Sequence, residues 1–388
     1  MKFEIMDAQL QDAVIKVIGV GGCGGNAVDH MIEQGVQGVE FIAINIDAQA
    51  LKRNKASTQL QIGATITKGL GAGAVPDVGR AAAEEDRARI AELVQGANMV
   101  FITAGMGGGT GTGAAPVVAQ VAREMDILTV AVVTKPFAHE GKRMRLAQAG
   151  IEALSEYVDS LIIVPNEKLM TVLGEDTTLL DAFRSSNGVL QGAVAGIAEV
   201  INVPGLVNVD FADVRTLMSE NGMAMMGSAT ASGPERAKLA AERAMSSPLL
   251  EDVDLAGARG VLVNISSNCS LTLKEYREVT NSVQFAIEDA TVIVGSVFDE
   301  GMGDDLRVTI VATGLGSPVE RKQLKPVLAY EEQKRTGTHD EPISCVNYNE
   351  LDKPAVMRSN RHREAIEAMK QSGVDTLDIP SFLRKQAD

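Results

Sequence analysis

The alternation of apolar runs with glycine-rich turns and helical segments limits most strongly what this chain can fold into. Continuous apolar runs rich in β-branched residues, typical of strands buried on both faces, occupy residues 13–20, 39–47, 98–105 and 127–136. Helical patterns at residues 21–35, 79–97 and 115–126 separate these runs. The repeated order of strand, turn and helix predicts an α/β fold, with a Rossmann-like parallel sheet covered by helices on both faces.

The chain of 388 residues is long enough for further parts beyond this first domain. We expect the α/β domain to span residues 1–176 and one long, largely buried central helix to span residues 177–202. A smaller α+β domain is predicted at residues 203–316, with strands at 258–266, 290–299 and 306–314. The rest is predicted to be a disordered tail, with a polar linker at residues 317–372 and a peptide at residues 373–388 that regains apolar side chains.

Charge and hydropathy exclude several classes of protein. A formal net charge of −15 argues against a nucleic-acid-binding surface, which needs clustered Lys and Arg. The longest apolar runs are too short to cross a bilayer, so we expect no direct membrane insertion. Residues 1–12 carry acids where a secretory signal carries a basic start, which predicts a cytoplasmic protein. Cys23, Cys269 and Cys345 lie too far apart to suggest a disulfide framework or a zinc site.

The stretch GMGGGTGTGAAP, residues 105–116, lies between a predicted strand and a predicted helix. Its glycines therefore belong to the carboxyl edge of the sheet, where backbone N–H groups at a helix start bind anions. Small side chains let the backbone approach phosphate oxygens, and Thr110 and Thr112 add hydroxyl donors. The alternative is a mobile connector, but the position of the loop favours a phosphate-binding site.

The first turn, GVGGCG at residues 19–24, matches the dinucleotide-binding pattern G-x-G-x-x-G, with Asp47 at the expected distance. An NAD-dependent oxidoreductase is therefore one alternative. However, no histidine has an obvious catalytic setting, and simple NAD binding gives a second phosphate loop no role. A P-loop motif is absent from the sequence. Several glycine-rich loops at one sheet edge fit a mononucleotide triphosphate better.

Three motifs carry a resemblance to a known family. GGGTGTGAAP at residues 107–116 resembles the signature of the tubulin and FtsZ superfamily, NVDFADV at 208–214 resembles the FtsZ synergy loop, and LDIPSFLRKQAD at 377–388 is similar to the FtsZ adaptor-binding peptide. The resemblance implies a GTPase that binds GTP or GDP with Mg²⁺ and assembles head-to-tail into filaments. It also implies a role in bacterial cell division, in the mid-cell ring on the inner face of the plasma membrane.

The resemblance also implies positions for the nucleotide. The first loop would use Gly22, Cys23, Gly24, Gly25 and Asn26, with Asn45 at the end of the second strand and Ala72, Gly73 and Ala74 near the γ-phosphate. The phosphates would lie on Gly107, Gly108, Gly109, Thr110, Gly111 and Thr112. Glu140 and Arg143 would contact ribose and phosphate, Asn166 the sugar, Phe183 the base and Asn187 the guanine edge. No protein side chain is assigned to a metal.

Several of these positions have a structural alternative. Asn26 could cap its helix, and Asn45 could be a turn residue. Phe183 could belong to the core, and Arg143 could be a surface residue paired with Glu140, with its role taken by Lys142 or Arg145. The resemblance favours the functional interpretation of each position.

Asp210 and Asp213 are three residues apart, so both carboxylates would share one face of a helix that begins there. Acids at a helix start are ordinarily caps or partners of the helix dipole, which is the structural alternative. The resemblance implies that Asn208, Asp210 and Asp213 complete the nucleotide site of the next subunit and orient the attacking water. If the acids are only caps, the chain would be a scaffold that binds GTP without hydrolysing it.

The tail implies partners. Leu377, Ile379, Phe382 and Leu383 are apolar anchors on a long polar linker, which suits a peptide that folds in a partner's groove. The resemblance implies the membrane adaptors FtsA and ZipA as partners of residues 373–388, and MinC as an inhibitor. The alternative is a disordered solubilising end.

Overall fold

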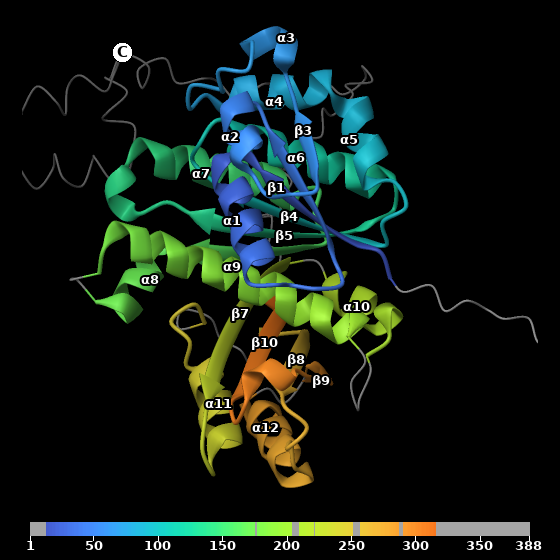
Figure 1. The fold of residues 1–388 in the computed structure, drawn as a ribbon, viewed down its shortest axis with the longest axis vertical. Helices are drawn as coiled ribbons and strands as arrows, with labels where there is room; N and C mark the ends of the chain where they lie inside the picture. The colour runs from blue at the N-terminus through green and yellow to red at the C-terminus, as the bar shows by residue number, and fades with distance from the viewer. Residues whose placement is uncertain are drawn as a thin grey trace, which may run out of the picture. The chain divides into compact units, whose positions relative to one another are not determined.

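The structure is a computed structural model that describes residues 13–174, 177–203, 209–220, 222–250, 257–286 and 290–315 (Figure 1). The predicted linker and peptide at residues 317–388 lie outside these residues, and so does Asn208. Among the described helices, none is long and apolar enough to cross a membrane.

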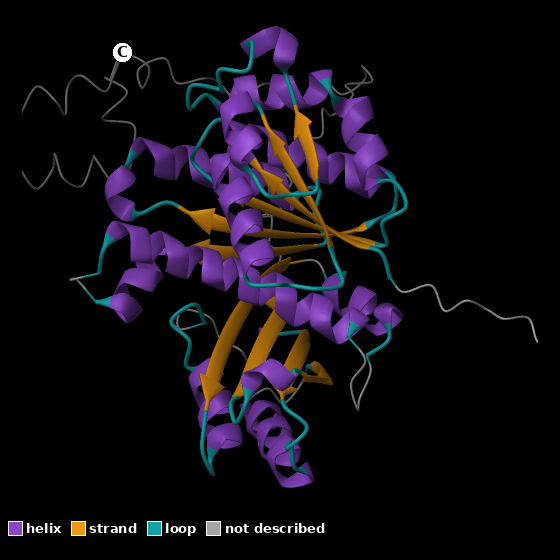
Figure 2. Cartoon of the chain, in the orientation of Figure 1, coloured by secondary structure: helices purple, strands orange, loops and turns teal. Residues whose placement is uncertain are grey.

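Ten strands form one sheet in the order β3-β2-β1-β4-β5-β6-β7-β10-β8-β9. The strands are drawn in orange in Figure 2. The strands of the first half are β1 Ile15–Val20, β2 Glu40–Asn45, β3 Thr58–Gln61, β4 Met99–Gly105, β5 Leu128–Lys135 and β6 Ser160–Pro165. All neighbours among these six pair in parallel, which confirms the predicted parallel sheet. β3 is short and polar, and it was not predicted.

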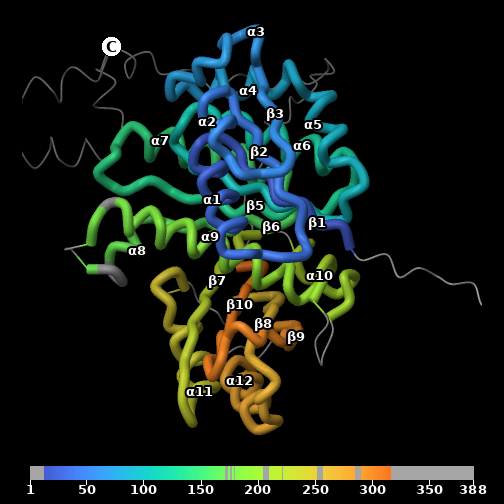
Figure 3. The backbone as a smooth tube through the Cα atoms, viewed as in Figure 1, coloured from blue at the N-terminus to red at the C-terminus, as the bar shows by residue number. Residues whose placement is uncertain are grey.

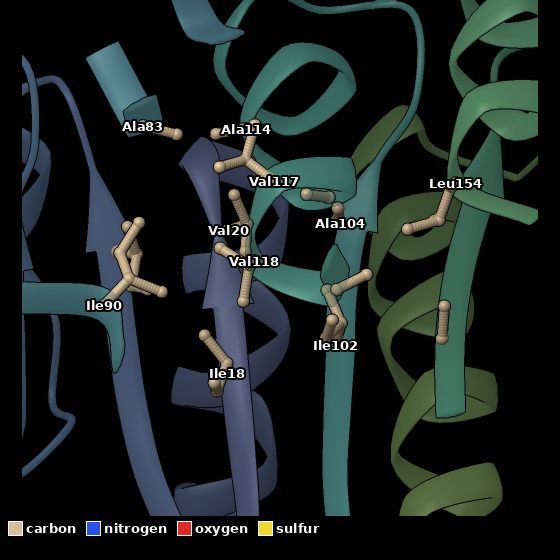
Figure 4. Close-up of a cluster of buried hydrophobic side chains, with 14 of the residues drawn as sticks. Ile18, Val20, Ala83, Ile90, Ile102, Ala104, Ala114, Val117, Val118 and Leu154 are labelled. Atoms are coloured by element: carbon tan, nitrogen blue, oxygen red, sulfur yellow. The ribbon is translucent and has the colours of Figure 1, made fainter. Parts of the chain in front are cut away.

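Helices cover both faces of this parallel half. Ile18, Val20, Ile102 and Ala104 point to one face, where they share a core with α4 Pro76–Glu85, α5 Arg87–Val94, α6 Thr110–Glu124 and α7 Lys142–Ser155 (Figure 4). Side chains of alternate positions, such as Val17 and Phe101, share the opposite core with α1 Gly21–Glu33 and α9 Leu179–Asn202. Because successive side chains of a strand point to opposite faces, apolar runs without alternation suit a sheet buried on both sides.

The second half of the sheet is mainly antiparallel. Its strands are β7 Gly222–Ala231, β8 Gly260–Ser267, β9 Thr291–Phe298 and β10 Leu306–Leu315, and β10 pairs antiparallel with both β7 and β8. Helices α11 Arg236–Met245 and α12 Leu273–Ala286 pack on this half and share a separate core with it. A parallel pairing from Ser160↔Gly222 to Ile162↔Ala224 joins the halves. The predicted α+β unit is therefore present, and it continues the first sheet.

The helix α9 passes between the two halves (Figure 3). It contacts β5 and β6 on one side and β8, β9 and β10 on the other. Leu190, Val194 and Ile197 are fully buried, as the predicted apolar stripe requires. At its carboxyl end the chain continues into α10 Phe211–Met218. The remaining short elements are α2 Ala48–Arg53, α3 Ala64–Thr67, η1 Ala138–Glu140, α8 Asn166–Leu173 and η3 Glu300–Met302.

Three predicted helices have different bounds. The helix predicted at residues 79–97 is two helices that meet at Asp86, because the Asp86 carboxylate accepts a hydrogen bond from Gly63 N at 2.8 Å and holds a non-helical backbone there. The helix predicted at 115–126 begins earlier, at Thr110, so part of the predicted loop is helical. The first helix ends at Glu33, two residues before Gly35, whose φ is +70°.

Candidate nucleotide-binding site

The loops that follow β1, β4, β5 and β6 meet at the carboxyl edge of the parallel half. They surround a hollow of about 270 Å³. Its walls comprise Val20, Gly22, Cys23, Gly105, Met106, Gly108, Gly109, Thr110, Gly111, Thr134, Pro136, Glu140, Arg143, Asn166 and Phe183. Residues from both predicted glycine loops and from the predicted sugar and base positions therefore line one cavity, as expected for ligands of open α/β sheets.

Three glycines of the first loop have different structural surroundings. Gly21 has φ +76°, and a Cβ on it would lie 2.9 Å from Gly111 N, so only glycine lets the two loops touch. A Cβ on Gly24 would lie 2.3 Å from the carbonyl oxygen of Thr103, so Gly24 lets α1 pack on β4. A Cβ on Gly22 would meet nothing within 4 Å, and Gly22 is the glycine that borders open space.

In the second loop, Gly107 turns the chain with φ +94°, and its N–H donates to Oγ1 of Thr112 at 2.8 Å. Thr112 is buried and does not line the hollow, so its hydroxyl stabilises the turn. Gly108, Gly109, Thr110 and Gly111 do line the hollow. Neither α6 nor α1 has a side chain that caps its first N–H groups, which leaves these donors at the hollow.

The loop with Ala72, Gly73 and Ala74 lies beside the second glycine loop. A Cβ on Gly109 would lie 2.7 Å from Cβ of Ala72, so the two loops are in close contact. Ala74 has φ +59°, a left-handed conformation that is uncommon for a residue with a Cβ. This loop does not line the hollow itself.

Glu140 and Arg143 line the hollow together. Arg143 Nη1 donates to Glu140 Oε2 at 2.8 Å, and Glu140 Oε1 accepts from Phe137 N at 3.1 Å. The Arg143 side chain is 62% exposed, so this pair contributes little to stability and the guanidinium can reach a ligand. Lys142 and Arg145, the alternatives for the arginine role, do not line the hollow.

Phe183 is 47% exposed in the hollow, so the alternative that it belongs to the core is wrong. Its ring lies edge-on to Phe137, with the ring centroids 6.2 Å apart. Asn166 is buried at the start of α8, and its Oδ1 accepts from Ser186 Oγ at 3.1 Å. Asn187 is half-buried on α9 and does not line the hollow.

Gly25, Asn26 and Asn45 line a second hollow of about 200 Å³, which shares Gly22 with the first. Asn26 lies inside α1, where it is exposed, so it does not cap the helix. Asn45 Oδ1 accepts from the backbone of Ile46 at 2.8 Å and Asp47 at 3.2 Å, as in the turn that was its alternative.

Asp47 caps α2, because its Oδ1 accepts from Gln49 N at 2.8 Å and from Ala50 N at 3.2 Å. This cap gives the Asp47 carboxylate a structural role.

Cys23 lines the hollow with its sulfur 3.6 Å from Thr134 Oγ1. Burial raises the pKa of the Cys23 thiol, and the hydrogen bond with Thr134 offsets part of this increase. The side chain is therefore a neutral thiol at pH 7 and acts as a small packing group.

The acids Asp210 and Asp213 lie elsewhere. Asp210 caps α10 by accepting from Ala212 N at 3.4 Å, and Asp213 lies exposed in the first turn. Arg215 on the same helix donates to Asp126 Oδ2 at 3.1 Å, and Asp126 precedes β5 at the amino edge of the parallel half. The hollow lies at the opposite, carboxyl edge. The structure thus shows the cap that was one alternative for Asp210, and it leaves both carboxylates accessible.

The helix α9 separates these acids from the hollow. Phe183 stands near its beginning and α10 follows its end, and the 19 residues that follow Phe183 in α9 span about 29 Å at 1.5 Å per residue. Asp210 and Asp213 therefore cannot reach the hollow of their own chain.

Comparisons with known proteins agree with this geometry. The model "Tubulin/FtsZ family, GTPase domain" matches residues 14–174, and the model "FtsZ family, C-terminal domain" matches residues 222–316. Cell division protein FtsZ of Pseudomonas aeruginosa is 58% identical over 393 residues, with both chains fully covered. The same protein of Coxiella burnetii is 55% identical, with 99% of each chain covered. The chain belongs to the FtsZ family.

Solved structures support the same assignment. An empty FtsZ dimer from M. jannaschii is 44% identical with a TM-score of 0.75, covering 79% of this chain and 89% of that chain. CetZ1 from Haloferax volcanii, at 21% identity and a TM-score of 0.68 over 79% of this chain and 96% of that chain, shares the fold. This FtsZ-family chain is therefore a GTPase of cell division that binds GTP and GDP, and the oxidoreductase alternative is wrong.

Some wall residues of the FtsZ-family site were missed in the sequence. Met106, Thr134 and Pro136 line the hollow but were not predicted. Thr134 and Pro136 lie at the end of β5, so the rule that ligands bind at the carboxyl ends of parallel strands could have found them. Among the described residues, no group of three or more His, Cys, Asp or Glu could hold a metal ion.

Proposed function

We propose that GTP occupies the hollow, with its phosphates on residues 22–26 and 107–112 and its nucleoside near Asn166, Phe183 and Asn187. The uncapped first turns of α1 and α6 supply backbone donors, which suit an anion in an acidic protein. A Cβ on Gly22 or Gly108 would meet nothing within 4 Å, so both glycines leave space for phosphate oxygens. Asn45, the loop 72–74, Glu140 and Arg143 complete the contacts.

A Mg²⁺ ion fits this arrangement as a partner of the triphosphate. Glu140, the carboxylate in the wall, is already paired with Arg143, so the phosphate oxygens would supply most of the ligands. When bound, Mg²⁺ neutralises charge that develops on the γ-phosphate.

We propose that the acids act on the nucleotide of the next subunit. In this arrangement Asn208, Asp210 and Asp213 of one copy orient the water that attacks the γ-phosphate in another copy. Contact between two different faces of identical subunits, without closure, generates an open head-to-tail filament. The separation of about 29 Å along α9 between Phe183 and Asn202 is the observation that carries this proposal.

Exposed apolar side chains support such a contact. Leu70 is 85% exposed and Ile66 and Val75 are exposed too, on the segment next to the loop 72–74. Burying them against a neighbouring copy would stabilise the filament, at roughly 25 cal/mol per Å² of apolar surface. Loss of the γ-phosphate would remove contacts at the same interface, so hydrolysis would drive filament turnover.

In the cell, the proposed filaments form the ring at mid-cell on the inner face of the plasma membrane. Residues 373–388 would bind the adaptors FtsA and ZipA, and MinC would oppose assembly. These proposals rest on the family and on the tail sequence.

Two inactive variants test the shared site. Asp213→Ala removes an acid and leaves the hollow intact. Gly108→Asp puts a negative charge where the phosphates would lie, at a glycine with open space, so the fold is kept. We expect Asp213→Ala to lose GTP hydrolysis by about 100-fold, the usual cost of removing one group that stabilises a transition state. We expect Gly108→Asp to lose hydrolysis because its carboxylate repels the phosphates. A mixture should recover activity, because Gly108→Asp donates acids to the GTP-filled hollow of Asp213→Ala.

Hydrolysis per subunit is measured against protein concentration, with light scattering in the same cuvette and bound GTP determined for each variant. Glu242→Ala, which removes an exposed acid on α11, is the matched control and should behave like the unmodified chain. Activity that stays constant per subunit in dilute samples without scattering would mean that each copy owns a complete site. A fully active Asp213→Ala variant would revive the scaffold that only binds GTP.

A further inference from the structure

Ser186 stands one helical turn after Phe183 on α9, and its side chain is buried against Asn166 on α8. Its hydroxyl donates to Asn166 Oδ1 at 3.1 Å. We propose that Ser186 is a positioning residue of the nucleotide site, which holds the Asn166 amide so that Nδ2 donates a hydrogen bond to the nucleoside. This inference rests on the proposed binding of GTP in the hollow.

The argument depends on the two ends of the amide. An asparagine side chain carries an acceptor oxygen and a donor NH₂, and either end could point at a ligand. A hydroxyl that donates to Oδ1 assigns the oxygen to the side of α9, so Nδ2 takes the opposite side. Without this hydroxyl, both orientations of the amide would compete for the ligand.

The surroundings of Asn166 indicate where Nδ2 points. The described part of the chain provides no hydrogen-bond partner for this nitrogen. Yet Nδ2 is not one of the fully buried side-chain atoms without a partner, which comprise Thr103 Oγ1, Ser160 Oγ, Asn202 Oδ1 and Asn264 Oδ1. Asn166 itself is only 6% exposed and lines the hollow. Because Asn166 lines the hollow and its Oδ1 is held on the side of α9, the proposal places Nδ2 at the hollow.

The position also indicates which part of the ligand is recognised. Phe183, three residues before Ser186 on α9, lines the hollow together with Asn166, whereas the phosphate donors lie at the starts of α1 and α6. A fixed N–H donor beside an aromatic ring suits an acceptor oxygen or nitrogen of a nucleoside. The Ser186 hydroxyl would thus contribute to nucleotide affinity without touching the nucleotide.

A double-mutant cycle on the full chain tests the inference. GTP binding is measured at equilibrium, below the concentration at which scattering begins, for Ser186→Ala, Asn166→Ala and the double variant. A neutral hydrogen bond contributes about 1 kcal/mol, so we expect Ser186→Ala to weaken binding about three- to tenfold. We expect Asn166→Ala to weaken it at least as much, and the double variant to match Asn166→Ala alone.

Two further variants separate positioning from general damage. Ser185→Ala changes the neighbouring serine, which lines a different cavity, and should bind GTP like the unmodified chain. Ser186→Thr keeps the hydroxyl and should restore most of the affinity. Thermal unfolding without nucleotide reports on the fold of each variant.

The proposal is overturned if Ser186→Ala binds GTP normally. It is also overturned if Ser186→Ala weakens binding by the same factor in the Asn166→Ala background, because its effect would then not act through the amide. If the unmodified chain itself does not bind GTP, the proposed function fails as well, and this result is distinct from the other two.

Discussion

The two edges of the parallel half differ in how they are built. At the carboxyl edge, close backbone contacts between glycines form a wall with few charged groups, and uncapped helix starts border the hollow. At the amino edge, α10 presents the exposed carboxylates Asp210 and Asp213 and is tied to Asp126 by a surface ion pair. The first edge can bind a ligand by itself, whereas the second offers acids without a comparable nucleotide cavity. This difference is what the proposed site shared between two subunits requires.

Of the changes considered, Gly113→Ala should have the largest effect on stability. It disturbs the carboxyl edge and leaves the amino edge unchanged. A Cβ on Gly113 would lie 2.0 Å from the carbonyl oxygen of Pro76, and only a shift of α4 or α6 could relieve the clash. We expect a loss of about 3 kcal/mol in the free energy of unfolding, the upper range for overpacking, together with weaker GTP binding. Urea unfolding and GTP titration measure both effects.

Gly188→Ala is the matched control for that prediction. It adds the same methyl group inside α9, where the nearest atom, His30 Nε2, would be 4.0 Å away. Alanine has a higher helix propensity than glycine, so the free energy of unfolding of this variant should rise by up to about 1 kcal/mol. Equal stability of the two variants would show that the close contact between α4 and α6 does not matter.

The second prediction concerns the smaller α+β domain, which includes α10. Glu275 on α12 pairs with the buried Arg236 at 2.7 Å, and this hydrogen bond lowers the pKa of Glu275 to about 2. We expect Glu275→Gln to lower the free energy of unfolding by about 2 kcal/mol at pH 7, because it leaves Arg236 buried without its counter-charge.

The pH dependence follows from the direction of that shift. A carboxyl whose folded pKa lies below its ordinary value of 4.5 stabilises the fold above pH 4.5 and loses this contribution as the pH falls towards 2. The difference between Glu275→Gln and the unmodified chain should therefore shrink over this window in denaturant titrations. Glu278→Gln, which affects a more exposed pair with Lys274, should change little at any pH; a cost equal to that of Glu275→Gln would contradict the prediction.

The smallest effect is expected for the tie between α10 and Asp126. Arg215→Ala or Asp126→Ala should cost less than about 1 kcal/mol in stability, as usual for an exposed pair. Because the pair fixes α10 relative to β5, we expect hydrolysis per subunit to fall a few-fold while GTP affinity is unchanged.

A charge reversal checks this prediction. The combination Asp126→Arg with Arg215→Asp should recover part of the lost rate, which would attribute the effect to the ion pair. A rate that is unchanged in both single variants would show that α10 is held by its apolar contacts alone.

Much of the fold was predictable because its elements have strong local patterns. β1, β2, β4 and β5 are continuous apolar runs, and α9 has an apolar stripe that only a long buried helix explains. The break at Asp86 was not predictable, because it depends on a hydrogen bond to Gly63, which is remote in sequence. The junction of β6 with β7 is equally non-local, and a short pairing leaves little sequence pattern.

Some parts of the candidate site were easier to predict from the sequence than others. Glycine loops after strands indicated the phosphate wall, and the structure places most of these residues around one hollow. The hydroxyl of Thr112, predicted as a phosphate donor, accepts from Gly107 N and does not line the hollow, and this contact depends on how the turn closes. The hydrogen bond between Ser186 and Asn166 joins separate helices, so no local pattern could reveal it.

The length of α9 has a consequence for the two tips of a growing polymer. In the proposed assembly, one tip ends in a GTP-filled hollow that no neighbouring acids cover, and the other tip ends in acids that face only solvent. The nucleotide of the last subunit at the first tip should then persist until another subunit arrives. The arrival of a new subunit would allow hydrolysis in the subunit that it covers. The time since that arrival would then decide when the covered subunit leaves.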